Sequence, residues 1–198
     1  MVPGFHPKLT YVLIAICVLV AVITRAGDQF ELLRPLLITN FVDAGLPEFF
    51  EGQIWRLITP IFIHFGLLHI GLNMIWLWQL GRLIEYAKGP LVLLTLVFIT
   101  GIGSNMAEFY ASGPLFGGMS GVIFALLGYL WVQGKFNPLF AVRINPKLFN
   151  MVMIWFVVCW SGVLEIVGVH IANWAHTTGL LTGIAVGFIA TRLQSHRI

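Results

Sequence analysis

Long apolar runs separated by short charged stretches constrain this chain more than any other feature of its sequence. Of its 198 residues, 59% are hydrophobic and only 10% are charged, whereas a water-soluble domain carries roughly 25% charged residues. One soluble core cannot bury that much apolar surface, so the sequence predicts an integral membrane protein. Because the apolar residues form runs rather than alternating with polar ones, the spans are expected to be helices.

Six apolar segments predict the membrane helices of this chain. They are residues 9–25, 67–84, 91–110, 120–133, 149–167 and 173–191. The sequence therefore predicts an all-α integral membrane protein, a six-helix bundle that forms one domain over residues 1–198. The long first loop, residues 26–63, mixes aromatic and charged residues, and it is expected to lie at the outer interface as short amphipathic pieces.

The basic residues predict the orientation of the bundle. With a cytoplasmic N-terminus, only Arg25, Arg34 and Arg56 lie outside. The other lysines and arginines fall on the cytoplasmic side: Lys8, Arg82, Lys88, Lys135, Arg143, Lys147, Arg192 and Arg197. This asymmetry follows the positive-inside rule and places both termini in the cytoplasm. The net charge of +3 is then a topological signal and does not indicate nucleic-acid binding.

A glycine-flanked serine opens the fourth segment. Residues 117–121 read Gly-Gly-Met-Ser-Gly, and the helix predicted from Ser120 spans only about 21 Å at about 1.5 Å per residue. The hydrocarbon core is about 30 Å thick, so Ser120 is expected below the outer surface. Irregular backbone at that depth needs protein or a water-filled cavity around it. The sequence therefore predicts an aqueous pocket that opens outward, with Ser120 at its floor.

Three further polar residues are expected at the level of Ser120. His69 and Asn73 are four apart, so they share one face near the outer end of the second segment. His176 lies near the outer end of the sixth. Histidine within a membrane span is costly, which makes each of these positions a functional hypothesis.

These side chains suit nucleophilic catalysis. Serine attacks only when a base takes its proton, and His176 is the candidate base. The developing oxyanion needs preorganised donors, which the Ser120 N–H, His69 and Asn73 can provide. We expect no carboxylate in the spans at the level of His176, and therefore a Ser-His dyad rather than a triad. Phe124, one turn below Ser120, is expected to stack on the imidazole.

Small residues predict that the fourth and sixth helices approach closely enough to join the dyad. Small residues that recur every three or four positions let helix backbones pack tightly in a membrane, although such spacing is found in helical bundles of any function. The residues are Gly121, Ala125 and Gly128 on one helix and Gly179, Gly183 and Gly187 on the other.

Three motifs, in order and over essentially the whole chain, resemble the rhomboid intramembrane serine proteases, and the six-helix layout is similar to the short bacterial, GlpG-like type. They are His64-(x4)-His69-(x3)-Asn73, Gly118-Met119-Ser120-Gly121 and Ala175-His176-(x2)-Gly179-(x3)-Gly183. The resemblance implies that Ser120 is the nucleophile and His176 the base, and that His69 and Asn73 line the oxyanion site. It also implies that Trp55 and Arg56 hold the first loop in the membrane. Close relatives often carry tyrosine where this chain has Phe124.

The resemblance further implies a hydrolase of the inner membrane without cofactor or metal. Its active site would open to the periplasmic or extracellular side. Its expected substrates are single-pass membrane proteins, cleaved near the outer end of their transmembrane segment through an acyl-enzyme. Access would be sideways from lipid, gated by the fifth helix and the loop of residues 164–173.

Several alternatives remain at this stage. A catalytically inactive rhomboid-like protein that binds membrane clients would normally lack Ser120 or His176. A transporter would normally show internal repeats. A metal site at His64, His69 and His176 lacks a carboxylate or thiolate, and the first two are expected to diverge on a helix. Cys17 and Cys159 lie in apolar runs and are expected to be packing thiols.

Overall fold

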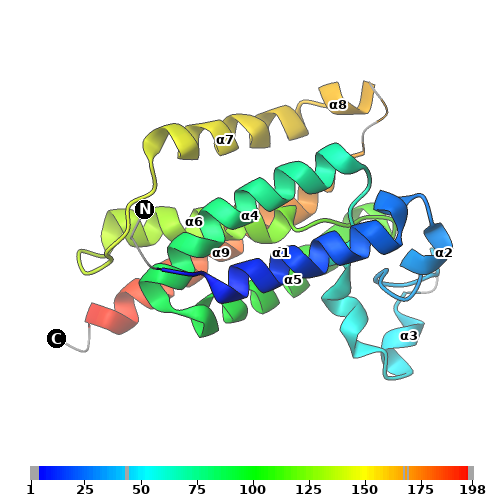
Figure 1. Ribbon diagram of the computed structural model, residues 1–198, viewed down its shortest axis with the longest axis horizontal. Coiled ribbons are helices and arrows are strands. Elements are labelled where there is room, and N and C mark those ends of the chain that lie inside the picture. The colour runs from blue at the N-terminus through cyan, green and yellow to red at the C-terminus, as the bar shows by residue number, and fades with distance from the viewer. Residues whose placement is uncertain (1–4, 43–44, 167, 169, 196–198) are drawn as a thin grey trace.

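The computed structural model describes residues 5–42, 45–166, 168 and 170–195, and every regular element within them is a helix. The longer helices lie side by side along the long axis of the molecule (Figure 1). They are α1 (Lys8–Ile23), α4 (Leu67–Lys88), α5 (Pro90–Ser112), α6 (Ser120–Phe136), α7 (Pro146–Trp160) and α9 (Asn173–Ser195). The start of α1 and the end of α9 lie at one end of the bundle, and α2 and α3 lie at the other.

Glycine and proline set the helix boundaries that position the site. α4 ends at Gly89, whose φ of 84° favours glycine, and Pro90 follows as the first residue of α5, where its missing N–H costs nothing. α5 ends in the same way at Gly113, with φ 86°. The non-helical stretch from there to α6 leads the chain back into the bundle.

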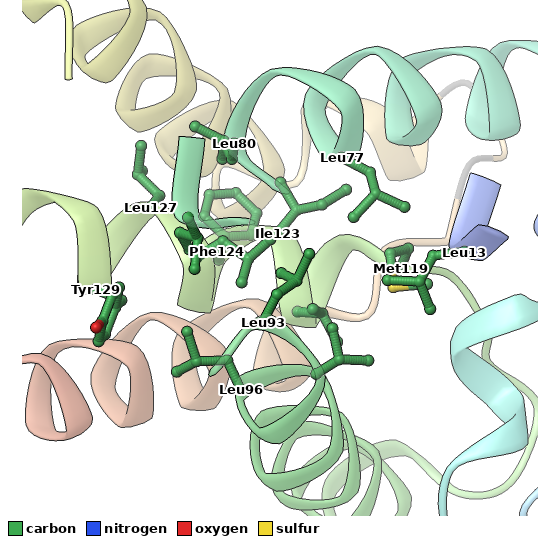
Figure 2. Packing of buried hydrophobic residues seen from close by; sticks show 14 of the residues in the cluster. Leu13, Leu77, Leu80, Leu93, Leu96, Met119, Ile123, Phe124, Leu127 and Tyr129 are labelled. Carbon is green, nitrogen blue, oxygen red and sulfur yellow. The ribbon is translucent and has the colours of Figure 1, made fainter. Parts of the chain in front are cut away.

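α6 lies at the centre of the molecule, with buried residues around its whole circumference. In Figure 2, its residues Ile123, Phe124 and Leu127 pack against Leu77 and Leu80 of α4 and against Leu93 and Leu96 of α5. A helix that is apolar on every side is typical of a bundle core. The N-terminus of α6 is therefore held by neighbours on all sides.

The first loop folds into short helical pieces. They are η1 (Arg25–Gly27), α2 (Phe30–Leu33), α3 (Pro47–Phe50), η2 (Ile54–Leu57) and η3 (Thr59–Phe62). Arg56 is 4% exposed and donates to the carbonyls of Arg34 and Leu37 at 2.7 and 2.8 Å, while Trp55 Nε1 donates to the carbonyl of Pro35. These bonds satisfy loop backbone that regular structure leaves unpaired.

The fifth and fourth predicted segments differ from the observed helices. Residues 149–167 were expected as one helix, but α7 ends at Trp160, and a turn through Gly162, with φ 76°, separates it from α8 (Val163–Ile166). Residue 167 lies outside the described residues. α6 has 17 residues, against 16 in α1 and 15 in α7, so it is not the only short helix. It is short only beside α4 and α5, with 22 and 23 residues.

Among the described residues, α5 is the one helix whose length and apolar composition both suffice to cross a bilayer, and α1 and α7 are apolar but shorter. The six-span count therefore stays a prediction.

Candidate active site

Ser120 and His176 meet at the ends of two helices. Ser120 is the first residue of α6 and His176 lies in the first turn of α9, and the distance from His176 Nε2 to Ser120 Oγ is 2.8 Å. His176 is only 4% exposed, and its Nδ1 is buried without a hydrogen-bond partner among the described residues. With the proton on Nδ1, Nε2 accepts from the serine hydroxyl, which is the arrangement that general-base catalysis requires.

The backbone before Ser120 needs glycine at two successive positions. Gly118 has φ 121°, a region that L side chains rarely adopt, and its N–H donates to the carbonyl of Pro60 at 3.0 Å. A Cβ on Gly117 would lie 2.7 Å from Cβ of Ile63. The first loop thus packs directly on the serine turn and fixes where α6 begins.

Glycines bring α6 and α9 into backbone contact. A Cβ on Gly179 would collide with the carbonyl oxygen of Gly121, and a Cβ on Gly183 with that of Ala125. One turn further, a Cβ on Gly128 would lie 2.7 Å from the carbonyl oxygen of Leu180. This approach positions His176 against Ser120, because the two side chains project from the first turns of the two packed helices.

Phe124 supports the imidazole from the side of the bundle. Its ring centroid lies 4.7 Å from that of His176 at an interplanar angle of 43°, and Phe156 of α7 packs edge-on against Phe124 at 5.3 Å. An aromatic contact of this kind restricts the orientation of a ring that has no carboxylate partner.

His69 and Asn73 lie on the α4 face next to the serine turn, as their spacing predicts. A Cβ on Gly118 would lie 2.8 Å from His69 Nε2, so this ring lies against the backbone near Ser120. Asn73 instead donates its side-chain amide to the His69 carbonyl at 2.9 Å, and its Oδ1 is buried without a partner among the described residues. In this structure the Asn73 amide therefore bonds its own helix.

The expectation that no carboxylate lies at the level of His176 is wrong. Glu108 of α5 is 2% exposed, and its Oε2 accepts a hydrogen bond from the Ala175 N–H, at 2.9 Å, directly before His176. The carboxylate accepts from a backbone N–H and not from the imidazole, whose Nδ1 has no partner within the described residues. The sequence does contain an indication of Glu108, since it is an acidic residue inside an apolar segment. Such a residue is costly in a membrane and is therefore a functional hypothesis.

The histidines do not form the arrangement considered for a metal. His64 precedes α4 instead of sharing it with His69, and the two rings are in contact, with centroids 5.1 Å apart, rather than divergent. Nδ1 of His64 lies 3.1 Å from the carbonyl of Phe62. In the part of the chain that the structure describes, no three His, Cys, Asp or Glu side chains are grouped to hold a metal ion.

With this fold and geometry in hand, comparison with known proteins identifies the family. Residues 51–193 match the family model of the Rhomboid domain, and the chain belongs to the rhomboid family. It is 32% identical over 184 residues to the "Rhomboid protease GlpG" of Salmonella newport (strain SL254), covering 92% of this chain and 63% of that protein. It is 33% identical over 183 residues to the protein of the same name from Enterobacter sp. (strain 638), with the same coverage. The chain thus spans less than two thirds of the length of these relatives. The resemblance stated from the three motifs is confirmed.

Proposed function

We propose that this protein is an intramembrane serine endopeptidase in which Ser120 is the nucleophile and His176 the general base. The observation that carries the proposal is the 2.8 Å separation of His176 Nε2 and Ser120 Oγ, between two packed helices of a chain of the rhomboid family. The two similar Salmonella and Enterobacter proteins are named rhomboid proteases, which favours the enzyme over a client-binding protein without activity.

The proposed reaction proceeds in two steps. Ser120 Oγ forms a bond to the carbonyl carbon of the scissile peptide while its proton passes to His176 Nε2. The oxyanion is stabilised by the Ser120 N–H, which lies in the first turn of α6 and so has no intrahelical acceptor, together with His69. Asn73 joins them when its amide turns away from the His69 carbonyl. The C–N bond then breaks, the leaving amine takes the proton from His176, and water hydrolyses the acyl-enzyme by the same base.

The proposed substrates are single-pass membrane proteins, cut near the outer end of their transmembrane helix. α6 has 17 residues and α5 has 23, or about 26 and 35 Å at about 1.5 Å per residue, and this difference supports a position of Ser120 below the outer end of α5. In this proposal residues 1–198 form one protease domain of the inner membrane, and α1, α4, α5, α6, α7 and α9 span it. Both termini are cytoplasmic and the site opens to the opposite side. No metal or cofactor takes part in the proposed mechanism.

Fluorophosphonate labelling of the protein in detergent micelles tests the proposed chemistry. We expect covalent modification at Ser120, identified by peptide mass spectrometry, and its loss in His176→Ala and Ser120→Ala. A well-folded wild-type protein that resists labelling would contradict the proposal. So would cleavage of a single-pass model substrate in proteoliposomes that persists in Ser120→Ala.

A further inference from the structure

The inner face of α5 carries a stripe of buried polar side chains that the proposed chemistry does not use. They are Thr100, Ser104, Asn105 and Glu108, exposed by 0%, 1%, 3% and 2%. Thr100 donates back to its own helix, at the carbonyl of Leu96. Asn105 donates to the carbonyl of Leu57 in the first loop, at 2.9 Å. Glu108 instead contacts a different helix, α9, where it accepts from the N–H of Ala175.

A carboxylate suits the place that Glu108 occupies. The N–H groups in the first turn of α9 have no partner within the helix, and the positive end of the helix dipole lies there. Glu108 Oε2 accepts one of them, the N–H of Ala175, at 2.9 Å. A charged acceptor strengthens such a bond, and the bond in turn offsets the cost of burying the carboxylate. The interaction therefore ties the first turn of α9 to α5.

One turn away on the same face, α5 also contacts the serine helix. A Cβ on Gly121, the residue after Ser120, would lie 2.6 Å from Ser104 Oγ and 3.2 Å from the carbonyl oxygen of Ala175. Ser104 and Glu108 are four residues apart and so lie one above the other on α5. Two residues one turn apart on α5 therefore contact the residues next to Ser120 and His176: Ser104 lies against Gly121, and Glu108 accepts from Ala175.

The imidazole depends on this backbone contact more than a triad histidine would. Its only hydrogen bond among the described residues is the one to Ser120, because Nδ1 is buried without a partner. The ring is therefore oriented by Phe124 and by the position of its own backbone. A shift of about 1 Å in a catalytic group can lower the rate about 100-fold.

We propose that Glu108 is a positioning residue, whose buried carboxylate sets the distance between His176 and Ser120 through the Ala175 N–H. It acts on the backbone of the base-bearing helix, where a triad aspartate would act on the imidazole. This inference rests on the proposed function, since it assigns Glu108 a part in the reactivity of Ser120.

The test compares Glu108→Leu, which removes the acceptor, with Glu108→Gln, which keeps an acceptor oxygen without the charge. Glu85 provides a matched control. It is also buried, and its carboxylate accepts from the N–H groups of Leu9 and Thr10 at the start of α1. Glu85 also accepts from Thr10 Oγ1 at 2.7 Å, so Glu85→Leu removes a helix-end carboxylate with more hydrogen bonds than Glu108, from a different pair of helices.

The measurements are the melting temperature, the rate of fluorophosphonate labelling at Ser120, and kcat and KM for a single-pass substrate in proteoliposomes. We expect Glu108→Leu to lower kcat and the labelling rate at least 10-fold with KM changed less than threefold. Glu108→Gln should recover to within about threefold of wild type. Glu85→Leu should lower the melting temperature at least as much as Glu108→Leu but leave kcat per folded molecule unchanged.

The outcomes separate this inference from the proposed function. Wild-type labelling rates in Glu108→Leu, or an equal loss of kcat in Glu85→Leu, would overturn the positioning role while leaving the serine protease intact. If Glu108→Leu does not fold, Glu108→Gln decides: a loss as large as that of His176→Ala would show that the charge acts in the chemistry itself, and the positioning role would be wrong. Absence of labelling in the wild type would reject the protease first.

Discussion

Two helices that flank the proposed site, α9 and α7, are attached to the bundle in opposite ways. α9 contacts α6 backbone to backbone along three successive turns, at Gly179 and Gly183 of α9 and at Gly128 of α6. α7 buries only Val152 and Cys159, and many of its large apolar side chains are exposed, including Ile154 and Val157 at 64% each. α9 carries His176, the proposed base, whereas α7 contacts the site through the edge of Phe156 on Phe124 and through hydrogen bonds of its last turn to the first turns of α9.

The difference shows which motions the fold permits. Two backbones in contact have no side chains that can rearrange, so a relative shift of α6 and α9 requires the whole interface to separate. α7 is attached through side-chain contacts and two hydrogen bonds to α9, which can break without a separation of backbones in contact. A helix that moves without disturbing Ser120 and His176 is suited to admit a substrate sideways, and this favours the gate that we expected at the fifth helix. Of the loop expected to share that role, residues 164–166 belong to α8, and residues 167 and 169 lie outside the described residues.

The largest expected effect comes from breaking the α6–α9 contact. In Gly183→Ala the added Cβ meets the backbone carbonyl of Ala125, which has no flexible end to give way. We expect a loss of stability at the upper end of the roughly 1–3 kcal/mol typical of overpacking, and a labelling rate at Ser120 reduced about 100-fold. Gly103→Ala in α5 is the matched control, because its Cβ would meet nothing within 4 Å, and it should match wild type in melting temperature and labelling.

A smaller effect is expected where the two regions meet, at Phe124. Phe124→Leu keeps an apolar residue in a site that is 2% exposed but removes the ring face beneath His176. Because an aromatic contact contributes about 0.5–1.5 kcal/mol, we expect labelling to slow by up to about 10-fold. The control is Phe149→Leu, which removes a ring 6.1 Å from Trp131 on the far part of α7. Equal losses in both variants would mean that general packing, and not support of the imidazole, explains the change.

Patterns of residue type predicted the tightly packed region better than the loose one. Ser120 opens α6, and the small residues of α9 do meet those of α6, because glycine spacing encodes backbone approach directly. The predicted end of α7 was wrong, because Ser161 and Gly162 were taken as part of an apolar run. The composition of an apolar segment does not distinguish one helix from two helices joined by a turn. Glu108 was missed because its partner, the Ala175 N–H, is a backbone group that no side-chain pattern reports.

Asn73 shows a further limit of sequence reasoning. Its spacing from His69 correctly predicts a shared helix face, but the direction of its amide depends on competing acceptors. The His69 carbonyl one turn before it takes that hydrogen bond in the structure. Side-chain amides and hydroxyls in helices often find such local partners, so residue type and spacing predict the helix face of Asn73 but not the direction of its amide.

The smallest expected effect concerns one of two hydrogen bonds between the end of α7 and α9, the other being donated by Asn173 Nδ2 to the carbonyl of Cys159 at 3.2 Å. Trp160 Nε1 donates to Thr177 Oγ1 at 3.0 Å, although the indole is 43% exposed. Trp160→Phe removes this donor and keeps most of the apolar contact with Trp174. One such bond contributes about 0.5–1.5 kcal/mol, so α7 should separate more readily while α6 and α9 stay in place.

We expect Trp160→Phe to raise the cleavage of a single-pass substrate about two- to threefold, measured as kcat/KM. The rate of fluorophosphonate labelling should not change, since a small probe needs no gate. Trp155→Phe on the same helix is the control and should change neither rate. A fall in labelling in Trp160→Phe would mean that α7 helps to hold the base, and the division between a fixed α9 and a movable α7 would then be wrong.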